Sequence, residues 1–315
     1  EKFENEFSYR TNKLISFFND RENNLWICSF NGLCMLPWQN LLWKTIPLFD
    51  NVTGFTIEPR NIAELNNGNF LAGNNSSCGA VMLNIKTQQA SVIQNPDYNP
   101  KSNDDYSMHA VCKVTDDLIL GWGNDGLYQL SDNYDAWKKL KLTAVNFKSL
   151  PAAGSFFCDS MNRIFLSPHD GGLFELKIQS QEIEKLEIPD DTAQQYKLTF
   201  IDSRNNLWFT AQNGIMKWNL KNNHSENLGV DMKDSTISPI NFARSIAEDN
   251  QHHFWISTVT NGFYEWYVDD WNQQHWKNYN TSTFPDLKSD IIGEIKKDYE
   301  GNLWIGTVEI GRAHV

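Results

Sequence analysis

A short motif recurs seven times along this chain, and its regular spacing limits the folds that the chain can adopt. The clearest copies read Asn-Leu-Trp-Ile or a close variant, and weaker copies place another apolar residue where the tryptophan stands. The repeated position is occupied by Trp26, Phe70, Ile119, Phe165, Trp208, Trp255 and Trp304. Successive copies are 44, 49, 46, 43, 47 and 49 residues apart. An even period of this length is typical of propellers and other arrays of one supersecondary unit.

Each repeat contains several short apolar runs separated by turn residues. In the first repeat the runs are residues 14–18, 25–29, 33–36 and 41–46, and Asn31-Gly32 between the second and third is a hairpin signal. Four short antiparallel strands make one propeller blade. We therefore expect an all-β, seven-bladed β-propeller with four-stranded antiparallel blades and the repeated aromatic rings buried between blades. The seventh blade is expected to be truncated, because its repeat ends near Val308.

An acidic residue stands six positions before the repeated aromatic in six of the repeats. These residues are Asp20, Glu64, Asp159, Asp202, Asp249 and Asp298. A carboxylate at this place can accept backbone N–H groups inside a turn. We therefore interpret these residues as structural parts of the turn between the first and second strands.

The consensus Asp-x-x-x-Asn-Leu-Trp-Ile, followed by Asn-Gly-Leu, resembles the two-component regulator propeller repeat. The best copies span residues 298–307 and 202–210, and the resemblance covers about residues 14–308. It implies the periplasmic sensor region of an inner-membrane hybrid histidine kinase, which senses an oligosaccharide or another small polar ligand. The kinase would lie outside this chain, and the parent receptor could form a homodimer. The resemblance leaves open whether the seven repeats form one propeller or parts of two.

Charge and composition narrow the possible partners. The formal net charge of −12 argues against nucleic acid and anionic membrane surfaces, which attract basic proteins. The sequence has no apolar run long enough to span a membrane. Its five cysteines fit neither a zinc motif nor a disulfide framework, and we expect them to be small buried residues. No metal site and no cofactor are expected.

Candidate ligand residues lie in the turns between the second and third strands, because propellers commonly present ligands on that face. They are Trp122, Asn124, Asp125, His169, Asp170, Gln212, Asn213, Thr260 and Asn261. Trp122 and His169 stand out, since a turn requires neither residue type. The alternative is that these Asn, Asp and Thr residues are simply good turn formers.

Two other classes of function compete with a sensor. A sialidase-like enzyme would need an arginine cluster for its acidic substrate and an Asp-to-aromatic interval of five residues, whereas the interval here is six. A lyase would need metal ligands, but the adjacent His252 and His253 are interpreted as solvated turn residues. A protein-interaction scaffold could use aromatics on outer strands, namely Trp38, Trp43, Trp137, Trp271 and Trp276. We expect no enzymatic activity in this chain.

The last seven residues form a separate case. Residues 309–315 match the translation of a sequencing adapter, so we expect a non-native tail there and a propeller domain over residues 1–308.

Overall fold

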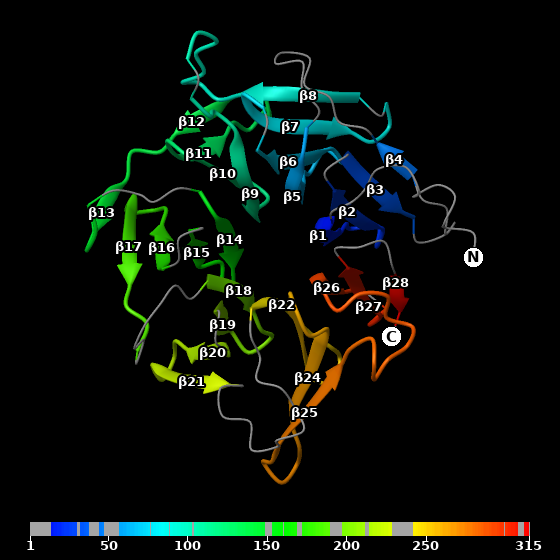
Figure 1. Cartoon of the computed structure of the whole chain (residues 1–315). Helices are drawn as coiled ribbons and strands as arrows, with labels where there is room; N and C mark the ends of the chain where they lie inside the picture. Colours follow the sequence, from blue (N-terminus) through cyan, green and yellow to red (C-terminus); the bar gives the residue numbers. More distant parts are fainter. Residues whose placement is uncertain are drawn as a thin grey trace. The chain divides into compact units, whose positions relative to one another are not determined.

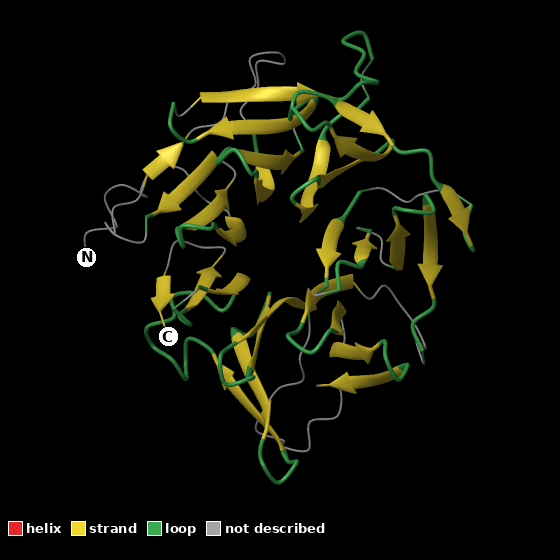
Figure 2. Cartoon of the chain, turned by 180° about the vertical axis from the view of Figure 1, so that it is seen from behind, coloured by secondary structure: helices red, strands yellow, loops and turns green. Residues whose placement is uncertain are grey.

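The computed structural model describes residues 14–29, 32–37, 44–46, 57–75, 77–87, 89–102, 104–148, 153–159, 161–168, 172–189, 197–211, 214–228, 242–298, 300–307 and 312–314. The regular structure of these residues is entirely β-strand (Figure 2), which confirms the all-β prediction. No helix among them is long and apolar enough to cross a membrane. The chain divides into two compact units, one formed mainly by Ile15–Asp170 and Phe174–Leu186 and the other mainly by Glu187–Val315.

Unit 1 contains four sheets, which we name blades 1 to 4 in chain order (Figure 1). Blade 1 comprises β1 (Leu14–Asn19), β2 (Leu25–Ser29), β3 (Gly32–Leu36) and β4 (Lys44–Ile46). Blade 2 comprises β5 (Pro59–Glu64), β6 (Phe70–Asn74), β7 (Gly79–Asn84) and β8 (Gln89–Gln94). Blade 3 comprises β9 (Met108–Thr115), β10 (Leu118–Gly123), β11 (Gly126–Leu130) and β12 (Trp137–Lys139). Blade 4 comprises β13 (Thr143–Val145), β14 (Ser155–Cys158), β15 (Ile164–Ser167), β16 (Leu173–Lys177) and β17 (Glu182–Leu186).

Unit 2 contains two further blades and a smaller sheet. Blade 5 comprises β18 (Lys197–Ile201), β19 (Asn206–Ala211), β20 (Gly214–Asn219) and β21 (His224–Leu228). Blade 6 comprises β22 (Ala243–Glu248), β23 (Phe254–Thr258), β24 (Phe263–Val268) and β25 (Gln274–Tyr279). Sheet 7 comprises β26 (Ile292–Lys297), β27 (Leu303–Thr307) and β28 (Arg312–His314).

Within each unit, consecutive sheets pack on one another through their first and second strands. The contacts are β2 with β5, β5 with β9 and β9 with β14 in unit 1, and β18 with β22 and β22 with β26 in unit 2. Antiparallel sheets that follow one another in this way form the β-propeller arrangement. The core lies between the sheets, where large rings such as those of Trp26, Trp122 and Trp208 are fully buried.

The described strands confirm six blades but not the predicted seventh. Sheet 7 has three strands, and its third, β28, falls in the segment that we expect to be a non-native tail. Blade 4 differs from the prediction of four antiparallel strands, because the connection from blade 3 adds β13 to β17 in parallel. That residues 1–308 make up one domain stays a prediction.

The carboxylate before the repeated aromatic holds the turn between the first and second strands. In blade 5, Oδ1 of Asp202 accepts the backbone N–H groups of Arg204 at 3.0 Å and Asn206 at 2.8 Å. Its Oδ2 accepts the side-chain amide of Asn206 at 2.8 Å and the indole N–H of Trp208 at 2.8 Å. The predicted structural role of this carboxylate is confirmed. The indole bond also explains why carboxylate and tryptophan are six residues apart.

The other tryptophan-bearing repeats use the same indole bond. Asp20 accepts from Trp26 at 2.7 Å, Asp249 from Trp255 at 3.0 Å and Asp298 from Trp304 at 2.8 Å. Trp26 and Trp255 are buried as predicted, but Trp304 is only half-buried. In blades 1, 2, 3, 5 and 6 this face packs on the following sheet of the same unit, and the described part of unit 2 has no sheet after sheet 7.

Repeats without tryptophan satisfy the same turn differently. In blade 4, Phe165 has no N–H to donate, and Nε of Arg163 binds Oδ2 of the buried Asp159 at 2.6 Å instead. In blade 2 the turn begins at Leu65, whose backbone N–H donates to the carbonyl of Asn69 at 2.8 Å. The backbone N–H of Asp202 donates to the carbonyl of Asn206 in the same way in blade 5. Leu65 therefore takes the carboxylate's place, which corrects the assignment of Glu64 to that position. An apolar residue is tolerated there because blade 2 has no indole donor to satisfy.

The same register corrects the repeated position in blade 2. Leu71, six residues after the turn's first residue, stands where other repeats have tryptophan, so Phe70 was placed one residue too early. Phe70 faces blade 1, and its ring packs at a tilt on that of Trp26 with ring centroids 4.6 Å apart. Phe254 of blade 6 takes the corresponding place against Trp208, with the two rings stacked and their centroids 4.3 Å apart. Phe70 is thus the partner of a repeated tryptophan rather than its equivalent.

Blade 3 needs the same shift by one residue. Leu120 lies three residues before Gly123, the last paired residue of β10, as Trp208 lies three before Ala211 in β19. Leu120 therefore holds the repeated position, and Ile119 faces blade 2 in the core that blades 2 and 3 share. The short hairpin between β9 and β10 removes the carboxylate that marks the register elsewhere.

A second kind of carboxylate links the turns of neighbouring blades. Glu248 at the end of β22 accepts the backbone N–H and the hydroxyl of Ser203 in blade 5, both at 2.8 Å, and contacts Nδ1 of His252 at 2.6 Å. Glu64 accepts the backbone N–H of Arg21 in blade 1 at 2.8 Å. Burial alone would raise the pKa of Glu248, but the bonds from His252 and Ser203 hold this pKa below its usual value.

Candidate functional site

Five of the nine predicted ligand residues belong to the described part of the chain. They are Trp122, Asn124 and Asp125 in unit 1 and Thr260 and Asn261 in unit 2. His169, Asp170, Gln212 and Asn213 lie outside the described residues. The first three and the last two are therefore considered separately.

Trp122 is not available to a ligand, which corrects its assignment to an exposed turn. It is paired within β10, opposite Leu127 on one side and Ala110 on the other, and its side chain is fully buried. Its ring packs on Phe156 of blade 4 with centroids 5.7 Å apart. The turn is shorter than we inferred, because β10 extends to Gly123 and carries Trp122 into the core between blades 3 and 4.

Asn124 and Asp125 lie in a polar network with the connection between blades 2 and 3. Asp125 accepts the hydroxyl of Tyr128 and contacts Nζ of Lys139 at 3.1 Å, while Asp97 contacts the same Nζ at 2.7 Å. Burial raises the pKa of Tyr128, and its bond to Asp125 raises it further. The side-chain amide of Asn124 donates to Oδ2 of Asp105, which belongs to that connection, at 3.1 Å. These charges are paired within the protein, so the network forms a polar surface that is already satisfied.

Thr260 and Asn261 form the turn between β23 and β24. The amide of Asn261 donates to the hydroxyl of Tyr264 at 2.6 Å, and its backbone N–H donates to Oγ1 of Thr258 at 3.0 Å. Its carbonyl accepts the side-chain amide of Asn278 at 2.9 Å. Asn261 is engaged in holding the turn, in agreement with the alternative that such residues are turn formers. Ligand binding by Thr260 and Asn261 stays a prediction.

The outer aromatics named as candidate contacts for a protein partner differ in exposure. Trp271 is 80% exposed at the tip of the hairpin between β24 and β25. Trp137 is buried and donates its indole N–H to the carbonyl of Ile93 at 3.2 Å, and Trp276 is half-buried. Trp38 and Trp43 lie outside the described residues.

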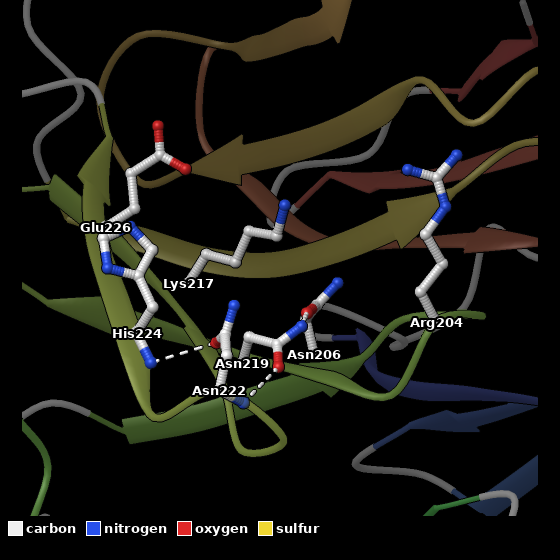
Figure 3. Close-up of a pocket in the computed structure, with 7 residues that line it drawn as sticks. All are labelled: Arg204, Asn206, Lys217, Asn219, Asn222, His224 and Glu226. Carbon is white, nitrogen blue, oxygen red and sulfur yellow. Dashed lines mark hydrogen bonds between the residues drawn. The ribbon is translucent and has the colours of Figure 1, made fainter.

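Blade 5 carries a polar hollow of about 290 Å³ that the sequence did not point to (Figure 3). We call it the blade 5 hollow, and it is lined by Arg204, Asn206, Lys217, Asn219, Asn222, His224 and Glu226. Most of these residues alternate along β19, β20 and β21, so they share the face of blade 5 that also carries Trp208. Figure 3 shows the side chains of Lys217 and Glu226 on neighbouring strands of this face. The hollow is thus built on strands rather than on a loop.

The blade 5 hollow combines cationic groups with several amides. Nζ of Lys217 lies 5.5 Å from the ring centre of Trp208 and 5.9 Å from that of Trp266. Among the described residues no carboxylate forms an ion pair with Arg204 or Lys217. Nδ2 of Asn219 donates to Oδ1 of Asn206 at 2.7 Å, which fixes the orientation of both amides. The lining of the blade 5 hollow therefore carries two positive charges, those of Arg204 and Lys217, and one carboxylate, that of Glu226. Its net charge is positive, although the whole protein is acidic.

The hollow lies toward one end of the strands of blade 5, and the predicted ligand turn between β19 and β20 lies at the other end. Arg204 belongs to the turn between β18 and β19, and Asn222 to the turn between β20 and β21. In an antiparallel sheet these two turns lie at one end of the strands, and the turn between β19 and β20 lies at the other end. One sequence signal could have indicated the hollow: polar residues stand at alternate positions of β20 and β21, where other blades have apolar ones. For example, Trp208 is paired with Lys217 in blade 5, whereas the equivalent Trp26 is paired with Met35 in blade 1.

Unit 1 carries a second hollow, of about 430 Å³, between its first strands. It is lined by Phe18, Asn19, Asp20, Arg21, Ile62, Ala63, Glu64, Val111, Cys112 and Lys113. Both of its cationic side chains already form ion pairs. Nζ of Lys113 lies 2.7 Å from Oδ1 of Asp116, and Nε of Arg21 lies 3.8 Å from Oε2 of Glu64. Among the described residues, no group of three or more His, Cys, Asp or Glu side chains is placed to hold a metal ion.

The chain resembles solved extracellular domains of bacterial signalling systems. Over 96% of its length it matches the extracellular domain of a proposed hybrid two-component system of B. thetaiotaomicron, BT3049, with a TM-score of 0.70 and 16% identity. It matches the extracellular domain of a second proposed system of that organism, BT4673, over 94% of its length with a TM-score of 0.67 and 16% identity. The chain covers 39% and 37% of these two domains, and at such identities the similarity shows the propeller fold alone.

Similar scores are reached by a propeller enzyme. Virginiamycin B lyase from Staphylococcus aureus matches 96% of this chain with a TM-score of 0.68 and 11% identity, and the chain covers 94% of the lyase. No protein-family model and no curated protein sequence matches the chain. Function must therefore be inferred from the residues rather than from the fold.

Proposed function

We propose that this chain is the ligand-sensing propeller part of an extracytoplasmic receptor region, in a hybrid two-component sensor histidine kinase, and that it recognises an oligosaccharide. Support comes from the repeat, which resembles two-component regulator propellers, and from the match to sensor ectodomains over 94–96% of the chain. The chain covers less than two-fifths of those ectodomains, and kinase chemistry would reside elsewhere in the parent protein. In this proposal the receptor lies in the inner membrane, its ectodomain is periplasmic and can dimerise, and this part has no activity of its own.

The blade 5 hollow is the observation that carries the ligand proposal. The exposed amide nitrogen of Asn222 can donate hydrogen bonds to sugar hydroxyls, and Arg204 and Lys217 can hold a carboxylate of an acidic sugar. The net charge of −12 would repel an acidic chain, but a local cationic cluster offsets that repulsion at short range. We therefore favour a saccharide that carries an acidic group.

Lys217→Ala is expected to weaken binding about ten-fold or more, because a hydrogen bond to a charged group contributes about 1.5–3 kcal/mol. The measurement is isothermal titration calorimetry with a panel of neutral gluco-, manno- and galacto-oligosaccharides and uronic-acid oligosaccharides. Lys221→Ala is the matched control, because Lys221 is exposed in the turn between β20 and β21 and does not line the hollow. Its affinity should equal that of the unchanged protein.

The turns between the second and third strands provide the competing location. Asn124→Ala tests it, because Asn124 is exposed and belongs to the predicted ligand turn. A loss of affinity in Asn124→Ala, with full affinity in Lys217→Ala, would move the site to those turns and refute the blade 5 hollow as the binding site.

A further inference from the structure

Two cysteines from neighbouring blades lie in direct contact in unit 1. Cys112 belongs to β9 and Cys158 to β14, the innermost antiparallel strands of blades 3 and 4, and their Sγ atoms are 3.4 Å apart. The residues are 46 positions apart in sequence, nearly one repeat length. Cysteine spacing therefore gave no sign of the pair, since only the packing of one blade on the next brings the two together.

The two cysteines of this contact are less buried than the other three. Cys112 and Cys158 are half-buried, and Cys112 lines the hollow of unit 1. Cys28, Cys34 and Cys78 are at most 1% exposed. A small reagent in the hollow can therefore reach Cys112, whose direct neighbour Cys158 is also half-buried, whereas the remaining cysteines are enclosed.

The environment makes the two sulfurs unequal. The thiol of Cys112 can donate its hydrogen to the sulfur of Cys158, which lowers the pKa of Cys158. The same contact, together with burial, raises the pKa of Cys112. Cys158 is therefore the thiol that ionises first, and a thiolate is the reactive form of cysteine.

We propose that Cys112 and Cys158 are a redox-active pair that forms a disulfide between blades 3 and 4 in the presence of a small disulfide oxidant. The Cys158 thiolate attacks one sulfur of the oxidant, forms a mixed disulfide and releases the other half as a thiolate. Cys112 then loses its proton, attacks Sγ of Cys158 and releases the second half of the oxidant. Two protein thiols have lost two electrons and two protons, and the oxidant has become two thiols. The proposed periplasmic location would supply such oxidants, but the chemistry can be tested without it.

Oxidised glutathione is the probe. The purified chain is equilibrated with oxidised glutathione or with dithiothreitol, unfolded, alkylated with a maleimide and weighed by mass spectrometry. We expect five alkylated cysteines after reduction and three after oxidation, with peptide mapping assigning the missing two to Cys112 and Cys158. Five alkylated cysteines after oxidation, a glutathione adduct that persists on either residue, or a disulfide between two chains would overturn the proposal.

Thermal unfolding gives a second readout. A disulfide restricts the unfolded chain, so the oxidised protein should melt several degrees above the reduced protein. The difference should vanish in Cys112→Ser and persist in Cys34→Ser, where a buried cysteine outside the pair is changed. An equal difference in both variants would contradict the assignment. Since neither readout uses a saccharide, failure here leaves the proposed function intact, and failure of saccharide binding leaves this pair intact.

Discussion

Trp208→Ala is expected to lower the free energy of unfolding by about 3–5 kcal/mol, the range for removing a large buried ring. Trp208 is fully buried between blades 5 and 6. Its ring stacks on Phe254 at 4.3 Å and meets Trp266 edge-on at 5.5 Å. Its loss would leave a cavity and remove one of the four hydrogen bonds that Asp202 accepts. The change should appear as a lower denaturant midpoint in urea unfolding followed by tryptophan fluorescence and circular dichroism.

Trp271→Ala is the matched control for this experiment. The same residue type is removed from the same unit, but Trp271 is 80% exposed at a hairpin tip. Its substitution should change stability by about 0.5 kcal/mol or less. Comparable losses in the two variants would mean that the repeated tryptophan is not a core residue.

Asp202→Ala is expected to cost about 3 kcal/mol, although no apolar contact is removed. The carboxylate is 4% exposed and accepts four hydrogen bonds, two from backbone N–H groups and one each from Asn206 and Trp208. Each buried donor left without an acceptor costs about 1–3 kcal/mol, and the surrounding water can satisfy only those near the surface. The measurement is again the urea midpoint, with Asp132→Ala as an exposed control.

Blade 2 provides an internal test of this interpretation. It has leucine at both positions of the pair, Leu65 and Leu71, and both are fully buried. The double variant Asp202→Leu with Trp208→Leu should therefore be less destabilised than the sum of the single variants. Strict additivity would show that the carboxylate and the indole act independently.

The repeat made the fold class predictable. Its even spacing indicated blades, and the carboxylate six residues before tryptophan indicated a turn; both hold in the repeats that keep the full motif. Phe70 and Ile119 were placed one residue early because blades 2 and 3 lack the Asp–Trp pair that marks the register. Without it, a run of apolar residues fits either face of the strand, and only strand pairing decides.

The candidate site was harder to predict than the fold. Turn residues such as Asn261 follow from composition, but their bonds within the turn do not. Trp122 was assigned to the turn between the second and third strands, yet β10 continues through it into the core. The blade 5 hollow arises from alternate residues of three strands whose register sequence alone does not give. The Cys112–Cys158 contact likewise depends on how one blade packs on the next.

The most direct test of the central claim is a titration of the unchanged protein with the oligosaccharide panel, combined with chromatography of the saccharides after long incubation. We predict saturable binding of at least one acidic oligosaccharide and its recovery without hydrolysis or elimination products. Release of shorter or unsaturated saccharides would identify an enzyme, and absence of binding to every member by the folded protein would contradict the proposed oligosaccharide sensor.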